Sequence, residues 1–429
     1  MKVLMFGWEF PPNITGGLGT ACCGITKGLL SVANDIDITF VVPKAYEGRE
    51  NRNFKLLGAN EVDLIKSRIH PERFNLPIRY HAVDSGMLPY VDPLEYKNLR
   101  DYKVESLEQL KKKQQLSEIQ FSGKYGPDLL TEVHNFSVIG EYLAKQEKFD
   151  VIHAHDWLTY PAGIAAKRIT RKPLVVHVHA TEYDRSRGNV NPVVYQIEKE
   201  GMQESDLIIT VSDHTREIVV NNYGVPKSKV VTVHNGVEPL NKQILKQQFK
   251  KNLSDKVVTF LGRVTMQKGP EYFVKLAEKV IKNTKSVRFV MAGSGELLPD
   301  MIKQVAKTAI SDRFHFTGFL RGNEVFKMFM LSDIYVMPSV SEPFGICPLE
   351  AMQCGTPSII SYQSGVSEVV EYAIKTDYWN IESMSDAVYN VLGSPKLYKM
   401  LSKNGKKEVA EITWRKSAQK IYQAYSAVA

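Results

Sequence analysis

Cysteine is scarce in this sequence: four residues of 429 are cysteine, two of them are adjacent (Cys22 and Cys23), and no Cys-x-x-Cys pair occurs. A small secreted domain held together by disulfides would need a framework of paired cysteines. We therefore expect no disulfide framework, and a location in the reducing cytoplasm.

Long hydrophobic runs and basic runs are also absent. No stretch of about 18 apolar residues occurs, so the sequence predicts no membrane span. The start, MKVLMFGWEF, has one lysine and an early Glu9, which predicts a first strand rather than a signal peptide. No basic run is interleaved with aromatic residues, so we expect no nucleic-acid partner. The net charge of +8 fits either an ordinary basic surface or a preference for anionic partners such as nucleotides or lipid headgroups.

The chain is instead rich in short apolar segments with many β-branched residues, separated by helix-length segments. Strands are predicted at 2–6, 38–42, 150–154, 173–179, 207–212, 229–233, 257–262, 287–293, 314–318, 334–339 and 357–361, and helices at 18–33, 270–283, 298–310, 322–331 and 348–354. Near-continuous hydrophobicity is typical of parallel strands that are buried on both faces. The alternation predicts an α/β fold of two Rossmann-like domains, each a doubly wound parallel sheet, facing a cleft.

The boundary between the two predicted domains falls in VHNGVEPLNKQ, where Asn235 and Gly236 favour a turn. We assign residues 1–236 to the first domain and residues 237–414 to the second. Residues 93–148 are charged and helix-prone, and we interpret them as helical insertions in the first domain. Apolar positions at helical spacing near the end of the chain predict a helix over 415–429 that buries one face.

A glycine-rich loop, GWEFPPNITGGLGTACCG, follows the first predicted strand. Gly16 and Gly17 precede a helix, where glycine lets backbone N–H groups approach a phosphate and the helix N-terminus favours negative charge. A flexible loop is the plain alternative. A nicotinamide-dinucleotide fingerprint is disfavoured, because Cys22 stands where its third glycine would be and the second strand does not end in an acid.

Histidines gather at the ends of two later strands, in HAHDW (153–157) and HVHA (177–180). Alternate residues of a strand share one face, so each histidine pair points the same way. Together with Asp156 these histidines could form a metal site, or they could be ordinary core histidines. No further His or Cys has a suitable spacing, and we expect no metal ion.

Two basic side chains follow the end of the first strand of the second predicted domain. Arg263 and Lys268, in GRVTMQKGP, offer a planar fork and a point charge that bind oxyanions, although a solvated loop with two cations is the plain alternative. Gly293 lies in a second glycine turn, MAGSGEL, which alone is a weak signal.

Two glutamates stand eight positions apart in SEPFGICPLE. Gly345 and Pro348 predict that only the second half is helical, with Glu342 in a loop and Glu350 in the first turns of the helix. A capped helix start with surface acids is the plain alternative. Carboxylates are good acceptors for hydroxyl groups, so the pair could hold two separate clusters of hydroxyls.

The set TGGLG, HAHDW, HVHA, GRVTMQKG, AGSGE and SEPFGICPLEAMQCGTPSII resembles the retaining glycosyltransferases of GT-B fold, in particular the large family-four group with glycogen and starch synthases as relatives. The resemblance covers nearly the whole chain. The Glu-x7-Glu segment and the Arg-Lys pair are its most specific parts. By this resemblance the final helix would cross back and pack on the first domain, with Trp414 near the crossing.

The resemblance implies how a nucleotide-sugar donor would be bound. Arg263 and Lys268 match the pair that neutralises the donor diphosphate, and Glu350 matches the glutamate that binds the ribose hydroxyls. Glu342 matches the residue that holds the sugar hydroxyls near the reacting carbon. The remaining implied donor contacts come from backbone and glycine positions: Gly16, Gly17, Gly293, Phe344, Gly345 and Ile346.

In the first domain the resemblance assigns a catalytic residue and an acceptor-side residue. His179 matches the histidine that lies beside the anomeric carbon, and Asp156 matches an acid near the acceptor. One departure concerns the glycine loop, which reads Ile-Thr-Gly-Gly-Leu where bacterial glycogen and starch synthases carry Lys-x-Gly-Gly-Leu. The missing lysine puts the ADP-sugar donor and the polymer acceptor in question, but not the class of reaction.

The resemblance therefore implies a retaining glycosyltransferase that moves a hexose, with glucose expected, from a nucleotide-diphosphate sugar to an acceptor hydroxyl. An α-glucan acceptor, as in glycogen biosynthesis, is the first expectation. Transfer to a lipid or a small sugar in envelope or exopolysaccharide synthesis is the alternative. A non-catalytic nucleotide-sugar binding protein is the alternative from another class. No cofactor is expected beyond the nucleotide-sugar substrate.

Overall fold

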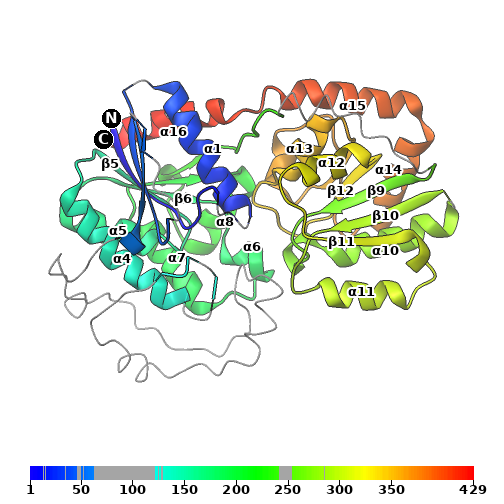
Figure 1. The fold of residues 1–429 in the computed structure, drawn as a ribbon, viewed down its shortest axis with the longest axis horizontal. Coiled ribbons are helices and arrows are strands. Elements are labelled where there is room, and N and C mark those ends of the chain that lie inside the picture. The colour runs from blue at the N-terminus through cyan, green and yellow to red at the C-terminus, as the bar shows by residue number, and fades with distance from the viewer. Residues whose placement is uncertain are drawn as a thin grey trace.

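The computed structural model describes residues 1–61, 121–240 and 254–429, apart from positions 13, 15, 34, 46–49, 52, 124, 127–128 and 285. The described chain forms two sheets flanked by helices, one in each half of the molecule (Figure 1). Of the predicted helical insertions at 93–148, residues 93–120 lie outside the described residues, and residues 129–146 form a helix.

The first sheet has eight strands in the order β3-β4-β2-β1-β5-β6-β7-β8. Its strands are β1 (Lys2–Phe6), β2 (Asp37–Val42), β3 (Glu50–Asn51), β4 (Phe54–Gly58), β5 (Val151–His155), β6 (Leu174–Val178), β7 (Leu207–Thr210) and β8 (Val230–Thr232). All neighbouring pairs are parallel except β3 with β4. The helices of this half are α1 (Gly17–Val32), α4 (Leu129–Gln146), α5 (Tyr160–Thr170), α6 (Glu182–Ser186), α7 (Pro192–Glu204) and α8 (Asp213–Tyr223), with short 3₁₀ turns η1 (Ala59–Glu61) and η3 (Lys227–Lys229).

The second sheet has six parallel strands in the order β11-β10-β9-β12-β13-β14. Its strands are β9 (Lys256–Leu261), β10 (Val287–Ala292), β11 (Phe314–Gly318), β12 (Ile334–Met337), β13 (Ser358–Ser361) and β14 (Ile374–Thr376). The helices that follow in this half are α10 (Pro270–Asn283), α11 (Leu298–Ala306), α12 (Asn323–Leu331), α13 (Cys347–Cys354), α14 (Ile381–Gly393) and α15 (Pro395–Val409), with 3₁₀ turns η4 (Met266–Lys268), η5 (Ser311–Arg313) and η6 (Gly365–Glu368). The predicted α/β architecture of two doubly wound parallel sheets is confirmed.

The last helix, α16 (Trp414–Val428), returns from the second half and packs against α1, so that both chain ends lie close together (Figure 1). Two glycines of α1 allow this close approach. A Cβ on Gly24 would lie 2.2 Å from the Trp414 ring, and one on Gly28 would lie 2.6 Å from the Trp414 carbonyl oxygen. Ile421 and Tyr425 are buried in the core of the first half.

The chain crosses between the halves at two places that lie side by side. Val237 forms a parallel bridge with Thr413 and donates its backbone N–H to the carbonyl of Ile412 at 3.1 Å. A Cβ on Gly236 would lie 2.2 Å from the Trp414 backbone nitrogen, so glycine is required at this crossing. A division of domains at 236/237 stays a prediction.

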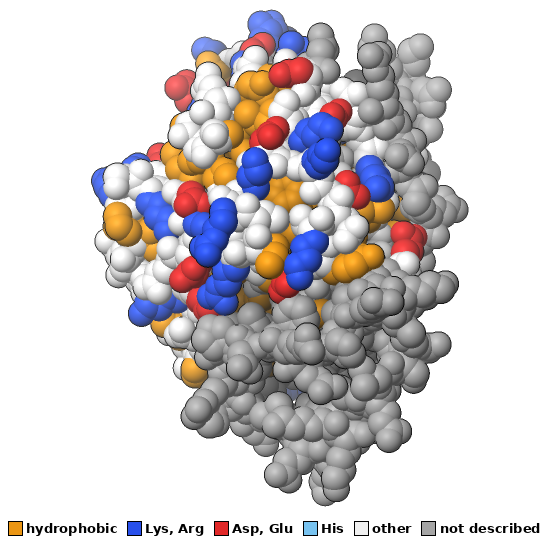
Figure 2. All heavy atoms as spheres, turned by 90° about the vertical axis from the view of Figure 1, so that its left-hand side faces the viewer, with side chains coloured by type: hydrophobic (Ala, Val, Ile, Leu, Met, Phe, Trp, Pro, Cys, Tyr) orange, Lys and Arg blue, Asp and Glu red, His pale blue; other side chains and the backbone are white. Residues whose placement is uncertain are grey.

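Surface charge is mixed on the face that Figure 2 shows, the left-hand side of Figure 1. Lys and Arg side chains there are interspersed with Asp and Glu instead of forming a continuous basic field. All four cysteines are free, as the sequence predicts. Among the described helices, none has the length and apolar character needed to cross a membrane.

Candidate functional site

The glycine loop after β1 leads directly into a helix N-terminus. Gly16 is the N-cap of α1 and Gly17 its first residue. A Cβ on either would meet none of the described atoms within 4 Å, and neither residue has a positive φ. Packing and backbone strain therefore give no reason for glycine at these two positions. Exposed backbone N–H groups at the start of a long helix suit an anionic group.

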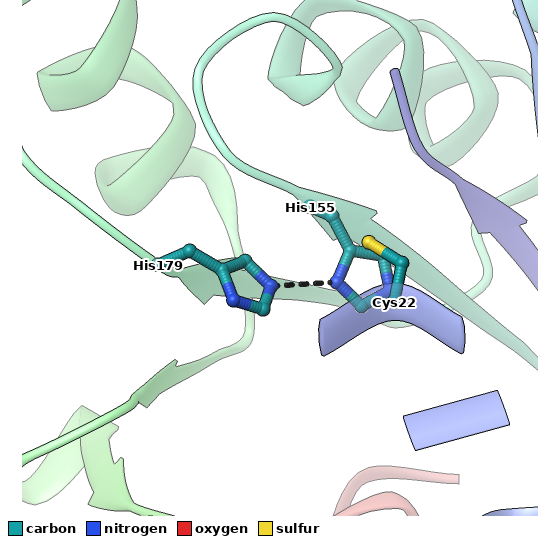
Figure 3. Close-up of side chains that lie close together, drawn as sticks. All are labelled: Cys22, His155 and His179. Atoms are coloured by element: carbon teal, nitrogen blue, oxygen red, sulfur yellow. Dashed lines mark hydrogen bonds between the residues drawn. The ribbon is translucent and has the colours of Figure 1, made fainter. Parts of the chain in front are cut away.

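Four histidine rings form a stack: two on β5, one on the neighbouring strand β6 and one, His179, directly after β6. Ring centroids of His153 and His155 are 4.1 Å apart, and those of His177 and His179 are 4.3 Å apart. Nδ1 of His155 lies 3.0 Å from Nε2 of His179 (Figure 3). Burial lowers the pKa of His153 and of His179 to about 3 and holds those of the other two well below the usual value, so all four rings are neutral at pH 7.

The stack does not have the geometry of a metal centre. Two sets of side chains that include these histidines bring their ligand atoms within 4.8 Å of one another: Cys22 with His155 and His179, and His153 with His155 and His177. Imidazole binds a metal ion in the plane of its ring, so ligand rings must converge on one point. The cross-strand pairs lie instead in near-parallel planes at 19–30°. These rings are better described as packed core histidines.

Asp156 lies at the turn after β5, and its carboxylate is directed to the backbone that follows β6. Its φ is 61°, an uncommon value for a residue with a side chain. The carboxylate is buried and accepts the backbone N–H groups of His179 at 2.7 Å and Ala180 at 3.3 Å. Its pKa is raised to about 6, chiefly by burial, although Arg185 at 3.8 Å opposes the shift. In the structure Asp156 fixes the backbone that carries His179, and its place near the acceptor stays a prediction.

In the second half, Lys268 and Glu342 are brought together. Lys268 closes the turn η4 and donates from its Nζ to Oε2 of Glu342, which is 6% exposed. Backbone contacts join the two segments: the N–H of Val340 donates to the carbonyl of Gln267 at 2.9 Å, and a Cβ on Gly269 would lie 2.2 Å from the carbonyl oxygen of Pro338. Arg263, in the same loop as Lys268, has Nη2 within 3.5 Å of the Gln267 side-chain oxygen.

The segment SEPFGICPLE adopts the predicted loop and helix. Pro348 is the second residue of α13, and Glu350 lies in its first turn. Gly345 has a φ of 98°, which glycine adopts without strain. The Phe344 ring is buried, with its centroid 6.2 Å from that of His234 in the first half, and Ile346 packs against the hydrophobic cores of both halves.

Gly293 lies at the end of β10, against the end of β9. Its φ is 141°, and a Cβ there would lie 1.8 Å from the carbonyl oxygen of Gly262. The glycine is therefore required by the packing of the two strand ends, whether or not a ligand binds there.

Burial raises the proton affinity of the Glu350 carboxylate. Its pKa is raised to about 7 from an ordinary 4.5 because burial disfavours the carboxylate. The folded protein therefore holds a proton that the unfolded chain releases above pH 4.5, and stability falls as pH rises from about 4.5 to 7.

Glu350→Gln removes this ionisation, so the variant should gain melting temperature relative to the native chain, and it should gain more at pH 8 than at pH 5. We expect the gain at pH 8 to exceed the gain at pH 5 by about 2–4 °C. Thermal unfolding at the two pH values measures the difference. An equal effect at both would contradict the shifted pKa.

Residues that the sequence did not single out join the two halves beside Glu342. Ser341 donates its hydroxyl to Oδ1 of Asp184 at 2.5 Å, and its oxygen lies 3.2 Å from Nε2 of His214. Glu368 accepts the backbone N–H groups of Asp213 and His214 at the start of α8. No spacing in the sequence marks these residues, because their pairing depends on how the two halves meet.

Two family profiles match adjacent parts of the chain. Residues 126–239 match Glycosyltransferase Family 4, and residues 241–408 match Glycosyl transferases group 1. An uncharacterized glycosyltransferase of Methanocaldococcus jannaschii is 27% identical over 99% of this chain and 98% of its own length. Glycogen synthase of Mycobacterium tuberculosis is 23% identical over 100% of this chain and 95% of its own length.

Solved structures share the fold at lower identity. Sucrose-phosphate synthase from Thermosynechococcus elongatus has a TM-score of 0.71 at 16% identity and covers 99% of this chain and 98% of its own. An Anabaena protein solved in complex with UDP and glucose has a TM-score of 0.64 at 16% identity over 100% of both chains. At these identities the likeness establishes the fold and leaves the substrate open.

Proposed function

We propose that this chain, which belongs to the GT-B glycosyltransferases with family 4 and group 1 domains, transfers a hexose from a nucleotide-diphosphate sugar to an acceptor hydroxyl with retention of the anomeric configuration. Glucose is the proposed hexose. The observation that carries the proposal is the contact of Lys268 with Glu342, on two loops that follow strands of the second sheet. A cation and a carboxylate in contact suit a donor that carries both a diphosphate and a sugar.

The roles proposed for the donor-side residues follow from charge. Lys268 and Arg263 would neutralise the diphosphate as it leaves, and in doing so Lys268 would exchange part of its contact with Glu342 for phosphate oxygens. Glu342 would then accept hydroxyl groups of the sugar, and Glu350 those of the ribose. Backbone N–H groups at Gly16, Gly17 and the loop around Gly345 would contact the phosphates. The proposal needs no metal ion and no cofactor.

Retention is proposed to occur by attack on one face of the sugar. The bond from the anomeric carbon to the diphosphate oxygen breaks, the bond to the acceptor oxygen forms on the same face, and the departing phosphate oxygen takes the acceptor proton. The geometry around Asp156 supports this route over a covalent intermediate, since that carboxylate is engaged with the His179 backbone. His179 would lie beside the reacting carbon as a neutral ring.

An α-glucan is the first proposed acceptor, on the full-length similarity to glycogen synthase. One observation favours a second candidate, a lipid or small-sugar acceptor: residues 14–18 read Ile-Thr-Gly-Gly-Leu and lack the lysine of the bacterial glycogen synthase pattern. Donor binding can be tested before any acceptor is known. ADP-, UDP- and GDP-glucose are compared for stabilisation against heat, where a ligand at 100 times its dissociation constant adds about 2.7 kcal/mol. Failure of all three to stabilise the protein would contradict the proposal.

The two glutamates are expected to divide their work. Glu350→Ala should chiefly weaken binding of the nucleoside diphosphate, by about tenfold, because it removes a hydrogen-bond acceptor for the ribose. Glu342→Ala should leave that binding within about threefold and slow transfer instead, because Glu342 acts on the sugar. Calorimetric titration with the stabilising diphosphate, beside initial rates, measures both effects. Equal binding by the two variants would refute the division.

A further inference from the structure

Ser341 stands immediately before Glu342, and its hydroxyl lies between two side chains of the first half. The hydroxyl donates to Oδ1 of Asp184 at 2.5 Å, and Nε2 of His214 lies 3.2 Å from the same oxygen. A serine hydroxyl has one hydrogen and two lone pairs. Since the hydrogen is directed to the carboxylate, the oxygen accepts from His214, which must then carry its proton on Nε2. We call this three-residue contact the Ser341 bridge.

Both first-half partners of the bridge are themselves held in place. Asp184 is fully buried in α6, where Oδ2 accepts the backbone N–H and the hydroxyl of Thr181, each at 2.8 Å. His214 lies in the first turn of α8, and its backbone N–H donates to Oε1 of Glu368 at 2.8 Å. Because Asp184 is anchored within the first half, it can set the position of Ser341 instead of following it.

Glu342 is otherwise positioned from within its own half. Its backbone N–H donates to the carbonyl of Gln363 and its carbonyl accepts the N–H of Gly365, both at 2.9 Å, while its carboxylate contacts Lys268. These contacts place it relative to the donor side. The Ser341 bridge adds a link to α6, which begins three residues after His179.

We propose that Asp184 and His214 are positioning residues for glycosyl transfer: through the Ser341 hydroxyl they align Glu342 with the His179 segment across the interface of the two halves. The inference rests on the proposed function for its catalytic consequence. The bridge would contribute to the transfer step, where donor and acceptor sides must be in register, and not to nucleotide binding, which involves the second half and the glycine loop.

Three variants test the bridge. Ser341→Ala removes the hydroxyl, Ser341→Thr keeps it, and Ser385→Ala is the matched control because its hydroxyl donates within α14 to the carbonyl of Glu382. We expect Ser341→Ala to lower kcat about tenfold, in keeping with loss of a hydrogen bond to a charged group. Its affinity for the nucleoside diphosphate should stay within twofold, and Ser341→Thr should recover most of the rate. A rate within twofold of the native chain, or an equal loss of binding, would overturn the proposal.

A second readout does not depend on turnover. The amides of Val340 and Glu342 are hydrogen-bonded within the second half, and their hydrogen exchange reports how well the segment 338–346 is held. Exchange of this segment should be at least fivefold faster in Ser341→Ala than in the native chain and unchanged in Ser385→Ala. Unchanged exchange in Ser341→Ala would overturn the bridge. If the native chain transferred no sugar, the proposed function would fail. The hydrogen-exchange comparison alone would then show whether the Ser341 bridge holds the segment in place.

Discussion

Replacing Lys268 by alanine is expected to lower the rate of glycosyl transfer by about 10²-fold or more while the fold is retained. Two effects add. The diphosphate loses a cation as negative charge develops on it, and Glu342 loses its ion-pair partner in a site where that carboxylate is 6% exposed. Initial rates at saturating donor, with circular dichroism as the check on folding, measure the effect.

The matched control for this variant is Lys303→Ala. Lys303 is a well-exposed lysine of α11 whose nearest acid, Asp300, is also exposed, so its removal should leave the rate within about twofold. A loss of two- or threefold on replacing Lys268 would remove it from the transfer step. Activity that returned with Lys268→Arg would show that charge, not the shape of the ammonium group, is what the site requires.

Deletion of residues 416–429 is expected to have the largest effect on stability. The deletion uncovers α1 beside Gly28, where the Ala418 side chain packs, and removes Ile421 and Tyr425 from the core of the first half. It also removes the hydroxyl that lies 2.6 Å from Nδ1 of His153, at the buried end of the histidine stack. We expect aggregation or a sharply lower melting temperature.

Two point variants separate packing from loss of chain length. Ile421→Ala should cost about 2–5 kcal/mol of unfolding free energy, because the side chain is fully buried. Lys420→Ala, next to it on the exposed face, should change the free energy by less than about 0.5 kcal/mol. Chemical denaturation measures both. A truncated protein with the stability and rate of the full chain would refute this account of α16.

The positions of most strands, in both halves, follow from patterns that are visible in the sequence. Each predicted strand overlaps an observed one, because a strand buried on both faces must be a continuous apolar run. The strands that were not predicted are β3, β4 and β14. β4 reads FKLLG and alternates between buried and half-buried positions, and β14 has three residues, so neither forms such a run.

The candidate site was predictable where chemistry is local. Pro348 and Gly345 fixed the loop-to-helix change between Glu342 and Glu350 through backbone rules that act over a few residues. The direction of the Asp156 carboxylate was not predictable, because it depends on the path of the backbone after β6. Asp184 and Ser341 are 157 positions apart, and only the meeting of the two halves brings them together.

The most direct test of sugar transfer is the release of free nucleoside diphosphate as a function of acceptor. ADP-, UDP- and GDP-glucose are each incubated with the native chain, with and without an α-glucan primer or a small-sugar acceptor, and the product linkage is read by nuclear magnetic resonance. The proposed function predicts that one donor releases diphosphate in proportion to added acceptor and forms an α-linked product. A donor that binds the protein, but from which no acceptor speeds the release of diphosphate, would contradict it.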